Sequence, residues 1–309
     1  MNIYINRLPV FGPWGGGAKF INSAYKFFPE LGHKVIRADD VKSKVDSMLM
    51  IGMDQDRAGI SVERAIMYKE VMRLHRNVKI ILRVNENDAR KGTTGVDKAL
   101  VAVSKYVDGT VFVSRWLQEY FEEKGWSCPN NIIIKNGVDS STFSPKQKKN
   151  NGKINIVSHH WSDNQMKGFD IYEKLDEWLA TPEGSKFTFT YIGRHRNTFK
   201  NTKIVNPLIG TELGDELGSY DVYLSASRFD PGPNHILESL ACGLPTLVHV
   251  DGGGCVEFAG EDAVFNDWDE LRKRLVSEQF PNVANTPPTQ DWQSCMKEYV
   301  NFIESVPSI

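Results

Sequence analysis

The stretch Ser225–Gly260, SASRFDPGPNHILESLACGLPTLVHVDGGGCVEFAG, carries the clearest structural signals in this sequence. It begins at the end of a predicted strand, and its prolines fix the loop that follows. Asn234 is a good N-cap for the next helix, and Gly243, with the proline two positions on, closes that helix. A second strand is predicted at Thr246–His249. This order of strand, helix and strand is typical of a parallel sheet covered by helices.

The predicted helix has a buried stripe, made by Ile236, Leu237, Leu240, Ala241 and Leu244. Glu238 lies outside that stripe, in what we expect to be the first turn. The N-terminus of a helix offers N–H groups to a phosphate, and a nearby carboxylate can accept hydrogen bonds from ribose hydroxyls. The stretch therefore predicts a nucleotide site. The alternative is that Glu238 only complements the helix dipole.

Short apolar runs alternate with amphipathic stretches along the rest of the chain, which predicts an α/β protein. The expected strands are Asn2–Ile5, Lys34–Arg37, Ser47–Ile51, Lys79–Val84, Gly109–Val113, Asn131–Ile134, Ile154–Ser158, Thr188–Ile192, Val222–Ser225 and Thr246–His249. A polar, lysine-rich segment, Ser144–Lys153, separates the two series and predicts an exposed linker. The tail Asp291–Glu304 predicts an amphipathic helix with Trp292, Met296, Tyr299 and Ile303 on one stripe.

The composition excludes several classes of protein. The 309 residues carry a net charge of −2, which does not suggest a nucleic-acid binder. The four cysteines lie far apart without a C-x-x-C pair, so metal-ligand spacing is absent. The start reads as a strand rather than a signal peptide, and no apolar run approaches the ~20 residues that span a bilayer. We expect a soluble, cytoplasmic protein, for which peripheral membrane contact stays open.

Several motifs follow one another along the chain in a set order. They are Gly15–Ala18 after the first strand, Ile134–Pro145 (IKNGVDSSTFSP), Lys167-Gly168, Asp230 with Glu238 eight positions on, Ala241–Pro245, and Gly252–Gly254 with Glu257. In this order and spacing the chain resembles the retaining glycosyltransferases of family four, which have the GT-B fold.

The resemblance implies two facing doubly wound Rossmann-type domains. Residues 1–146 would form the acceptor-side domain, 151–290 would form the domain that holds the nucleotide sugar, and the terminal helix within 291–309 would cross back to the first domain. The implied reaction is hexosyltransferase-like: a sugar passes from a nucleotide diphosphate sugar to a glycan or other acceptor hydroxyl, with retention. Neither a cofactor nor a metal is expected. The sequence leaves open whether the base is uracil or guanine.

Roles for individual residues follow from the same resemblance. Lys167 would balance the charge of the donor diphosphate, Glu238 would bind the ribose, and Asp230 would hold hydroxyls of the transferred sugar. Backbone amides around Gly232, Asn234 and His235 would help to seat the sugar and the pyrophosphate. Gly15 and Gly16 would let the N-terminal loop approach the phosphates and the acceptor closely.

The sequence also departs from the family pattern. Asp230 stands where glutamate is commoner, and Ser162 stands where the family usually has an arginine. His159, His160 or Arg194 would supply part of that missing positive charge, although the two histidines could instead be packing at a strand end. The chain is short for the family, so we expect trimmed loops on the acceptor side.

Two further groups lie in the first half. Arg83 and Asn85 follow a predicted strand and are candidates for acceptor binding, with a plain solvated turn as the alternative. Asp54-Gln55-Asp56 resembles the metal-binding tripeptide of the GT-A glycosyltransferases, but it lies in the half that should not hold the nucleotide. We therefore expect no metal site. Rival functions are a non-catalytic binder of nucleotide or glycan, and a GT-B-like epimerase or sugar-phosphate synthase.

Overall fold

The computed structural model describes residues 1–12, 15–40, 43–53, 59–71 and 77–307. It divides into two compact units, of which the first contains Met1–Phe11, Gly16–Gly137 and Trp292–Ile309, and the second contains Gly12–Gly15 and Val138–Asp291. The chain thus leaves the first unit at Gly137, before the lysine-rich segment. That segment lies along the second unit, where Lys146 and Lys149 donate backbone hydrogen bonds to Gly218 and Ser219. The acceptor and donor roles of the two units stay predictions.

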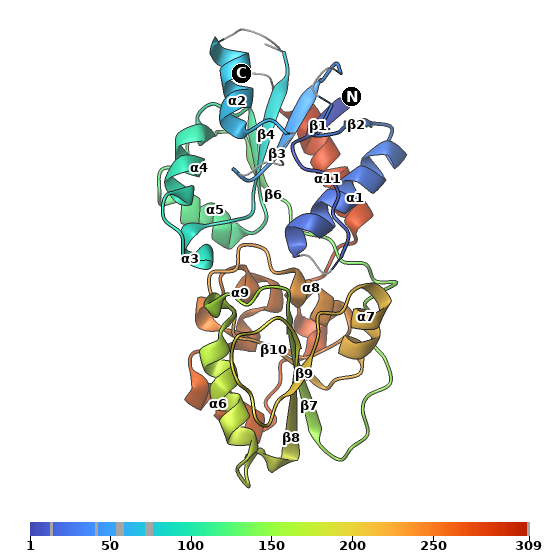
Figure 1. The fold of residues 1–309 in the computed structure, drawn as a ribbon, viewed down its shortest axis with the longest axis vertical. Helices are drawn as coiled ribbons and strands as arrows, with labels where there is room; N and C mark the ends of the chain where they lie inside the picture. The colour runs from blue at the N-terminus through green and yellow to red at the C-terminus, as the bar shows by residue number, and fades with distance from the viewer. Residues whose placement is uncertain (13–14, 41–42, 54–58, 72–76, 308–309) are drawn as a thin grey trace. The chain divides into compact units, whose positions relative to one another are not determined.

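The first unit is built on a sheet of six parallel strands in the order β2-β1-β3-β4-β5-β6 (Figure 1). The strands are β1 (Asn2–Ile5), β2 (Lys34–Ile36), β3 (Ser47–Ile51), β4 (Lys79–Val84), β5 (Gly109–Phe112) and β6 (Asn131–Ile133). The helices are α1 (Gly16–Glu30), α2 (Val62–Ile66) with the π-helical turn Met67–Val71, α3 (Asp88–Lys91), α4 (Val96–Ser104), α5 (Arg115–Glu122) and α11 (Trp292–Ser305). All six predicted strands are present, within one residue at each end.

The two faces of this sheet carry separate cores, because successive side chains of a strand point to opposite faces. Along β3, Met48 and Met50 join one cluster with Leu100, from α4. Leu49 and Ile51 join the other, which contains the buried faces of α1 and α11. The sheet is therefore apolar on both sides, as expected of parallel strands covered by helices.

The terminal helix α11 belongs to the first unit, although the second unit precedes it in the sequence. It lies beside α1 in Figure 1, and the ring of Phe20 in α1 lies 4.9 Å from that of Tyr299. Trp292, Met296, Tyr299 and Ile303 are each at most 9% exposed. The crossing helix and its buried stripe are therefore confirmed.

The second unit contains another six-stranded parallel sheet, in the order β12-β11-β10-β7-β8-β9. Its strands are β7 (Ile154–His160), β8 (Phe187–Gly193), β9 (Lys203–Val205), β10 (Val222–Ser225), β11 (Thr246–His249) and β12 (Val264–Phe265). Its α-helices are α6 (Phe169–Leu179), α7 (Gly210–Gly218), α8 (Asn234–Ala241), α9 (Gly254–Ala259) and α10 (Trp268–Val276). The edge strands β9 and β12 were not predicted, because β12 has two residues and the three of β9 are mostly exposed, so neither shows a buried apolar run.

The strand order of the second unit identifies where a ligand should bind. Numbered within the unit, the order is 3-2-1-4-5-6, which is that of the dinucleotide-binding α/β fold. In such sheets ligands bind outside the carboxyl ends of the strands, where the order reverses. Here that point lies between β7 and β10, which are paired through Ile156 and Val222.

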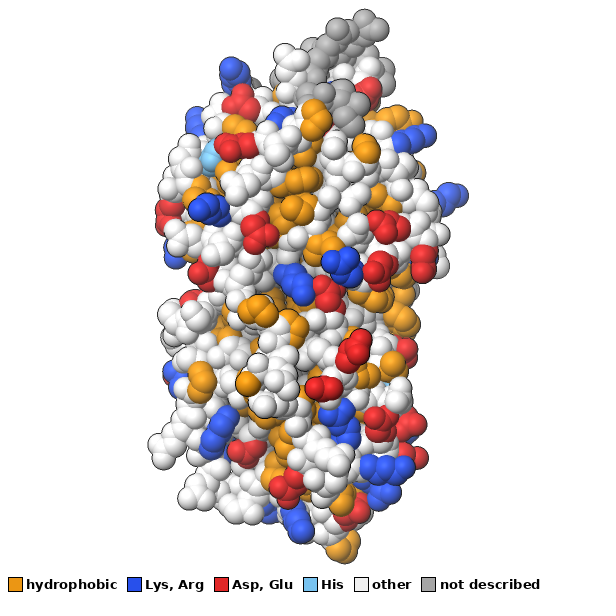
Figure 2. Space-filling view, turned by 180° about the vertical axis from the view of Figure 1, so that it is seen from behind, with side chains coloured by type: hydrophobic (Ala, Val, Ile, Leu, Met, Phe, Trp, Pro, Cys, Tyr) orange, Lys and Arg blue, Asp and Glu red, His pale blue; other side chains and the backbone are white. Residues whose placement is uncertain are grey.

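The surface and the helices give two further observations. On the face drawn in Figure 2, basic and acidic side chains are interspersed, and the described side chains form no broad field of one sign. None of the described helices is both long and apolar enough to cross a membrane.

Candidate functional site in the second unit

His159 and His160 lie at the carboxyl end of β7, which extends two residues beyond its predicted end. Both side chains are buried, at 8% and 4% exposure. The Nε2 atom of His159 lies 2.8 Å from Oε2 of Glu238. That of His160 lies 3.0 Å from the hydroxyl of Tyr172. The histidines are thus packed at a strand end and also hydrogen-bonded to polar groups of the site, so the two interpretations of the sequence do not exclude each other.

Lys167 lies in the 3-10 turn Gln165–Lys167 that follows β7. Its Nζ donates to Oδ2 of Asp230 over 2.9 Å, and both side chains are about nine-tenths buried. Gly168 holds this turn against the end of β10, because a Cβ at Gly168 would lie 2.1 Å from the carbonyl oxygen of Ala226. Its φ of +84° also favours glycine. The Lys-Gly pair therefore places the lysine at the switch point of the sheet.

Asp230 is fixed through its backbone by the glycine loop that follows β11. Its N–H donates to Gly252, and its carbonyl accepts from the N–H of Gly254. Between those two, Gly253 has a φ of +63°, which a residue with a side chain rarely adopts. The residue before the aspartate, Phe229, has a φ of +53°, and such strain is often found at functional sites. The glycine loop thus holds the loop that presents Asp230.

Glu238 lies in the second turn of α8, whereas the sequence predicted the first turn. The helix begins at Asn234 and its N-cap is Pro233, which makes no side-chain cap hydrogen bond. Asn234 is therefore the first helical residue, which moves Glu238 one position further into the helix. The residue is 3% exposed, and its role at a ribose stays a prediction. It faces His159 across the end of the sheet.

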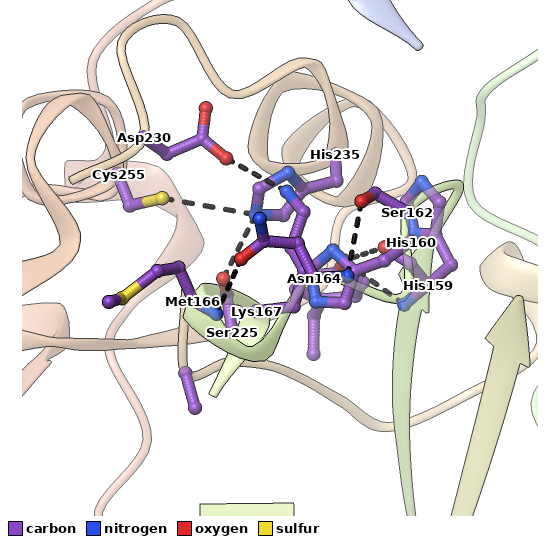
Figure 3. A network of polar contacts seen from close by, with 12 residues as sticks. His159, His160, Ser162, Asn164, Met166, Lys167, Ser225, Asp230, His235 and Cys255 are labelled. Atoms are coloured by element: carbon purple, nitrogen blue, oxygen red, sulfur yellow. Dashed lines mark hydrogen bonds and ion pairs between the residues drawn. The ribbon is translucent and has the colours of Figure 1, made fainter. Parts of the chain in front are cut away.

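His235, the second residue of α8, completes a cluster of three histidines that the sequence did not reveal (Figure 3). Its ring centroid lies 4.8 Å from that of His160 and 6.2 Å from that of His159. Its Nε2 lies 2.9 Å from the hydroxyl of Ser225 and 3.8 Å from Sγ of Cys255. Only the topology of the sheet brings these residues together, since they come from β7, β10, α8 and α9.

Two buried tyrosines support the end of β7. Burial raises the pKa of Tyr172 and of Tyr223, so both hydroxyls stay protonated at neutral pH. The Tyr172 oxygen accepts from the N–H of Ala226 over 3.1 Å. Tyr223 lies 3.3 Å from the backbone N–H and carbonyl of His159. These contacts keep the histidine backbone in register with β10.

The remaining donor-side candidates lie nearer the solvent. Arg194 is exposed, and its guanidinium lies 3.7 Å from the centroid of the Trp161 ring. Ser162, at the position of the family arginine, accepts through Oγ from the N–H of Asn164 over 3.2 Å. Arg194 is thus a cation near the end of β7. Gly232 is half-buried in the loop before α8.

The acceptor-side candidates lie at the carboxyl edge of the first sheet. Gly15 directly precedes α1, and Gly16 is the first residue of that helix. Asn85 is half-buried, and its Nδ2 would lie 4.0 Å from a Cβ placed at Gly17. The structure thus brings Asn85 next to the N-terminus of α1. Asp54 and Asp56 lie outside the described residues.

Arg83 is 1% exposed, which excludes the solvated turn considered as an alternative. Its Nε donates to the hydroxyl of Tyr299 over 3.1 Å, and its Nη2 donates to Oδ1 of Asn136 over 2.8 Å. The guanidinium lies 4.1 Å from the centroid of the Phe20 ring. Arg83 therefore joins β4 to α1 and α11. A part in acceptor binding stays a prediction.

Comparison with known proteins shows the fold. The sequence matches no protein-family model and no curated protein sequence. Among solved structures, Anabaena HepE in complex with UDP and glucose superposes with a TM-score of 0.71 at 13% identity, over 99% of this chain and 100% of that one. The lipopolysaccharide outer core galactosyltransferase WaaB gives a TM-score of 0.69 at 13% identity, over 99% of both chains.

Sucrose-phosphate synthase from Thermosynechococcus elongatus gives a TM-score of 0.65 at 12% identity, over 99% of this chain and 95% of that one. The likeness extends over both units. The chain therefore has the GT-B glycosyltransferase fold, with two Rossmann-like units.

Proposed function

We propose that this protein is a glycosyltransferase that moves a sugar from a nucleoside diphosphate sugar to an acceptor hydroxyl, with retention and without a metal. One observation carries the proposal. Lys167 pairs with Asp230, and Glu238 contacts His159, so both pairs lie at the carboxyl ends of β7 and β10, beside the start of α8. This is the place where a doubly wound sheet binds nucleotides.

The donor nucleotide would be held mainly by α8. The N-terminus of a helix favours a phosphate through its N–H groups and its dipole, and Pro233 provides no side-chain cap there. A carboxylate has about four lone-pair sites, so Glu238 can accept from ribose hydroxyls while it keeps its contact with His159. His159 thereby positions Glu238. His160 and Arg194 would add to the donor side.

The chemical step would depend on electrostatics. As the bond to the diphosphate breaks, negative charge grows on the leaving group, and the ammonium of Lys167 stabilises it. Asp230, which holds Lys167 in the absence of donor, would accept hydrogen bonds from the transferred sugar. None of the residues proposed for the site is an obvious covalent nucleophile. Retention follows from the resemblance to family four.

The acceptor would bind through Gly16, Arg83 and Asn85 of the first unit, together with Gly15, which directly precedes α1. The similar structures include a galactosyltransferase and a complex with UDP and glucose, which supports a hexose donor and a uridine nucleotide here. A glycan is the acceptor class that we propose. The mixed surface charge in Figure 2 favours a partner other than nucleic acid. We propose a cytoplasmic location.

Transfer should continue in excess chelator. The charge of the diphosphate is met by Lys167 and helix amides, so no divalent ion is needed. The measurement is release of nucleoside diphosphate from uridine and guanosine diphosphate sugars on addition of glycan acceptors, with and without chelator. Strict dependence on manganese or magnesium would contradict the proposal. It would also return attention to Asp54 and Asp56.

The same assay distinguishes a transferase from a non-catalytic binding protein. Ser162, in the position of the family arginine, favours a relative that binds a nucleotide or glycan without turning it over. Such a protein would bind the nucleoside diphosphate and release none from the sugar nucleotide when acceptor is added. An enzyme would release it in proportion to the product formed.

A further inference from the structure

Three metal-ligating side chains of different kinds converge beside the proposed sugar site. Asp230, His235 and Cys255 each present one ligand atom, and these atoms lie within 4.8 Å of one another. All three residues are buried. Figure 3 shows the Cys255 sulfur and the Asp230 carboxylate on the same side of the His235 ring. The proposed transfer reaction makes no use of the thiol.

The spacing of these atoms fits a small thiophilic cation. Zinc bonds of about 2.3 Å to sulfur and 2.0 Å to nitrogen, at a tetrahedral angle, place the two ligand atoms about 3.5 Å apart. Sγ of Cys255 and Nε2 of His235 lie 3.8 Å apart. Small side-chain rotations would therefore bring the ligands to bonding distance. Magnesium prefers six oxygen ligands in a near-ideal octahedron, which this set does not offer.

The backbone around the three ligands is already fixed. The N–H of Gly254, directly before Cys255, donates to the carbonyl of Asp230 over 2.8 Å. His235 follows the same loop as the second residue of α8. Such a site, held by short segments that are bonded to one another, requires little ordering when a metal enters.

We propose that Asp230, His235 and Cys255 form a binding site for Zn²⁺, and that occupation of this site inhibits the transferase. On binding, the thiol of Cys255 loses its proton to solvent, and the thiolate and the Asp230 carboxylate together balance the charge of the cation. Asp230 then no longer pairs with Lys167 and no longer reaches a sugar. The inhibition rests on the proposed function, whereas the binding site does not.

Cobalt serves as the probe, because four-coordinate Co²⁺ bound to a thiolate absorbs in the near ultraviolet and in the visible. Titration of the purified full-length chain should give these bands with one Co²⁺ per chain, and Zn²⁺ should discharge them. In the transfer assay Zn²⁺ should inhibit, chelator should restore activity, and Mg²⁺ should have no effect. Absence of the cobalt bands would overturn the site. Full activity with Zn²⁺ bound would overturn the inhibition.

Three variants locate the site. Cys255→Ser should abolish the near-ultraviolet band, whereas Cys242→Ser, at another buried thiol of the same unit, should keep it. Lys167→Met should tighten cobalt binding roughly tenfold or more, because the ammonium that competes for Asp230 is gone. A band that survives in Cys255→Ser, or an affinity that Lys167→Met leaves unchanged, would contradict the proposal. If no donor supports transfer, the proposed function fails, and the cobalt titration still decides the metal site.

Discussion

Replacing Lys167 with alanine should lower turnover by about 10²–10³-fold, with a much smaller change in donor affinity. The loss of one electrostatic donor aimed at developing charge typically has this effect. Lys167 meets charge that grows as the sugar leaves, so its contribution is larger in the transition state than in the bound donor. Steady-state kinetics, together with titration of the nucleoside diphosphate, separate the two quantities.

The buried pair makes a control for folding necessary. Alanine at position 167 leaves Asp230 without this partner, and breaking a buried ion pair commonly costs about 3–5 kcal/mol. The double variant Lys167→Ala with Asp230→Asn should recover much of that stability and no turnover. Arg228→Ala is a matched control, because this cation lies in the loop that also contains Asp230 and pairs with the exposed Asp170. Near-normal turnover in Lys167→Ala would place the donor phosphates elsewhere.

Deleting residues 292–309 should make the protein insoluble or unable to fold. The deletion exposes the face of the first unit that α11 covers and removes Tyr299, which accepts from buried Arg83. Each large apolar side chain of the helix contributes about 1.5–3 kcal/mol on burial. Four such residues together contribute about as much as the 5–15 kcal/mol that stabilises a typical domain. Expression and solubility of the truncated chain provide the first test.

Single substitutions give the quantitative version of this prediction. Ile303→Ala should lower the free energy of unfolding by about 2–5 kcal/mol, since the side chain is fully buried. Asn301→Ala, on the exposed face of the same helix, should change it by less than about 0.5 kcal/mol. Urea unfolding of both variants is the measurement. A soluble, fully active truncation would show that α11 is dispensable.

The fold was predictable because its signals are local. In the strand Lys79–Val84, for example, Ile80, Ile81 and Leu82 form a short apolar run, and runs of this kind indicate buried parallel strands without any partner being known. The terminal helix was predictable for the same reason, since Trp292, Met296, Tyr299 and Ile303 recur at helical spacing. The edge strands β9 and β12 were missed because neither contains a buried apolar run.

The candidate site was predictable only in part, because its contacts join distant segments. The resemblance singled out Lys167, Asp230 and Glu238, but no local pattern indicates that Lys167 lies 2.9 Å from Asp230. The contact of His159 with Glu238, 79 positions apart, depends equally on β7 lying next to β10. Cys255 gave no signal, because a lone cysteine in an apolar helix is usually part of the core.

The exposure of Arg83 was predicted wrongly, since its side chain is buried. A polar run at the end of a strand suggested an exposed group, and the sequence alone gives no reason to bury a cation there. The burial becomes understandable once α11 returns to the first unit, because Tyr299 and Asn136 then supply acceptors and Phe20 supplies an aromatic face. That return follows the 154 residues of Val138–Asp291, beyond the range of any local pattern.

The most direct test of the donor site is calorimetric titration of uridine and guanosine diphosphate into the wild-type protein and the Glu238→Gln variant. Ribose hydroxyls do not change during the reaction, so loss of the Glu238 charge should weaken binding more than it lowers turnover. A charge-assisted hydrogen bond of about 1.5–3 kcal/mol corresponds to roughly ten- to a hundred-fold in affinity. We expect this loss for one of the two nucleotides, and no loss in Glu261→Gln, which changes an exposed carboxylate of the same unit. An unchanged affinity in Glu238→Gln, or no binding of either nucleotide to the wild-type protein, would contradict it.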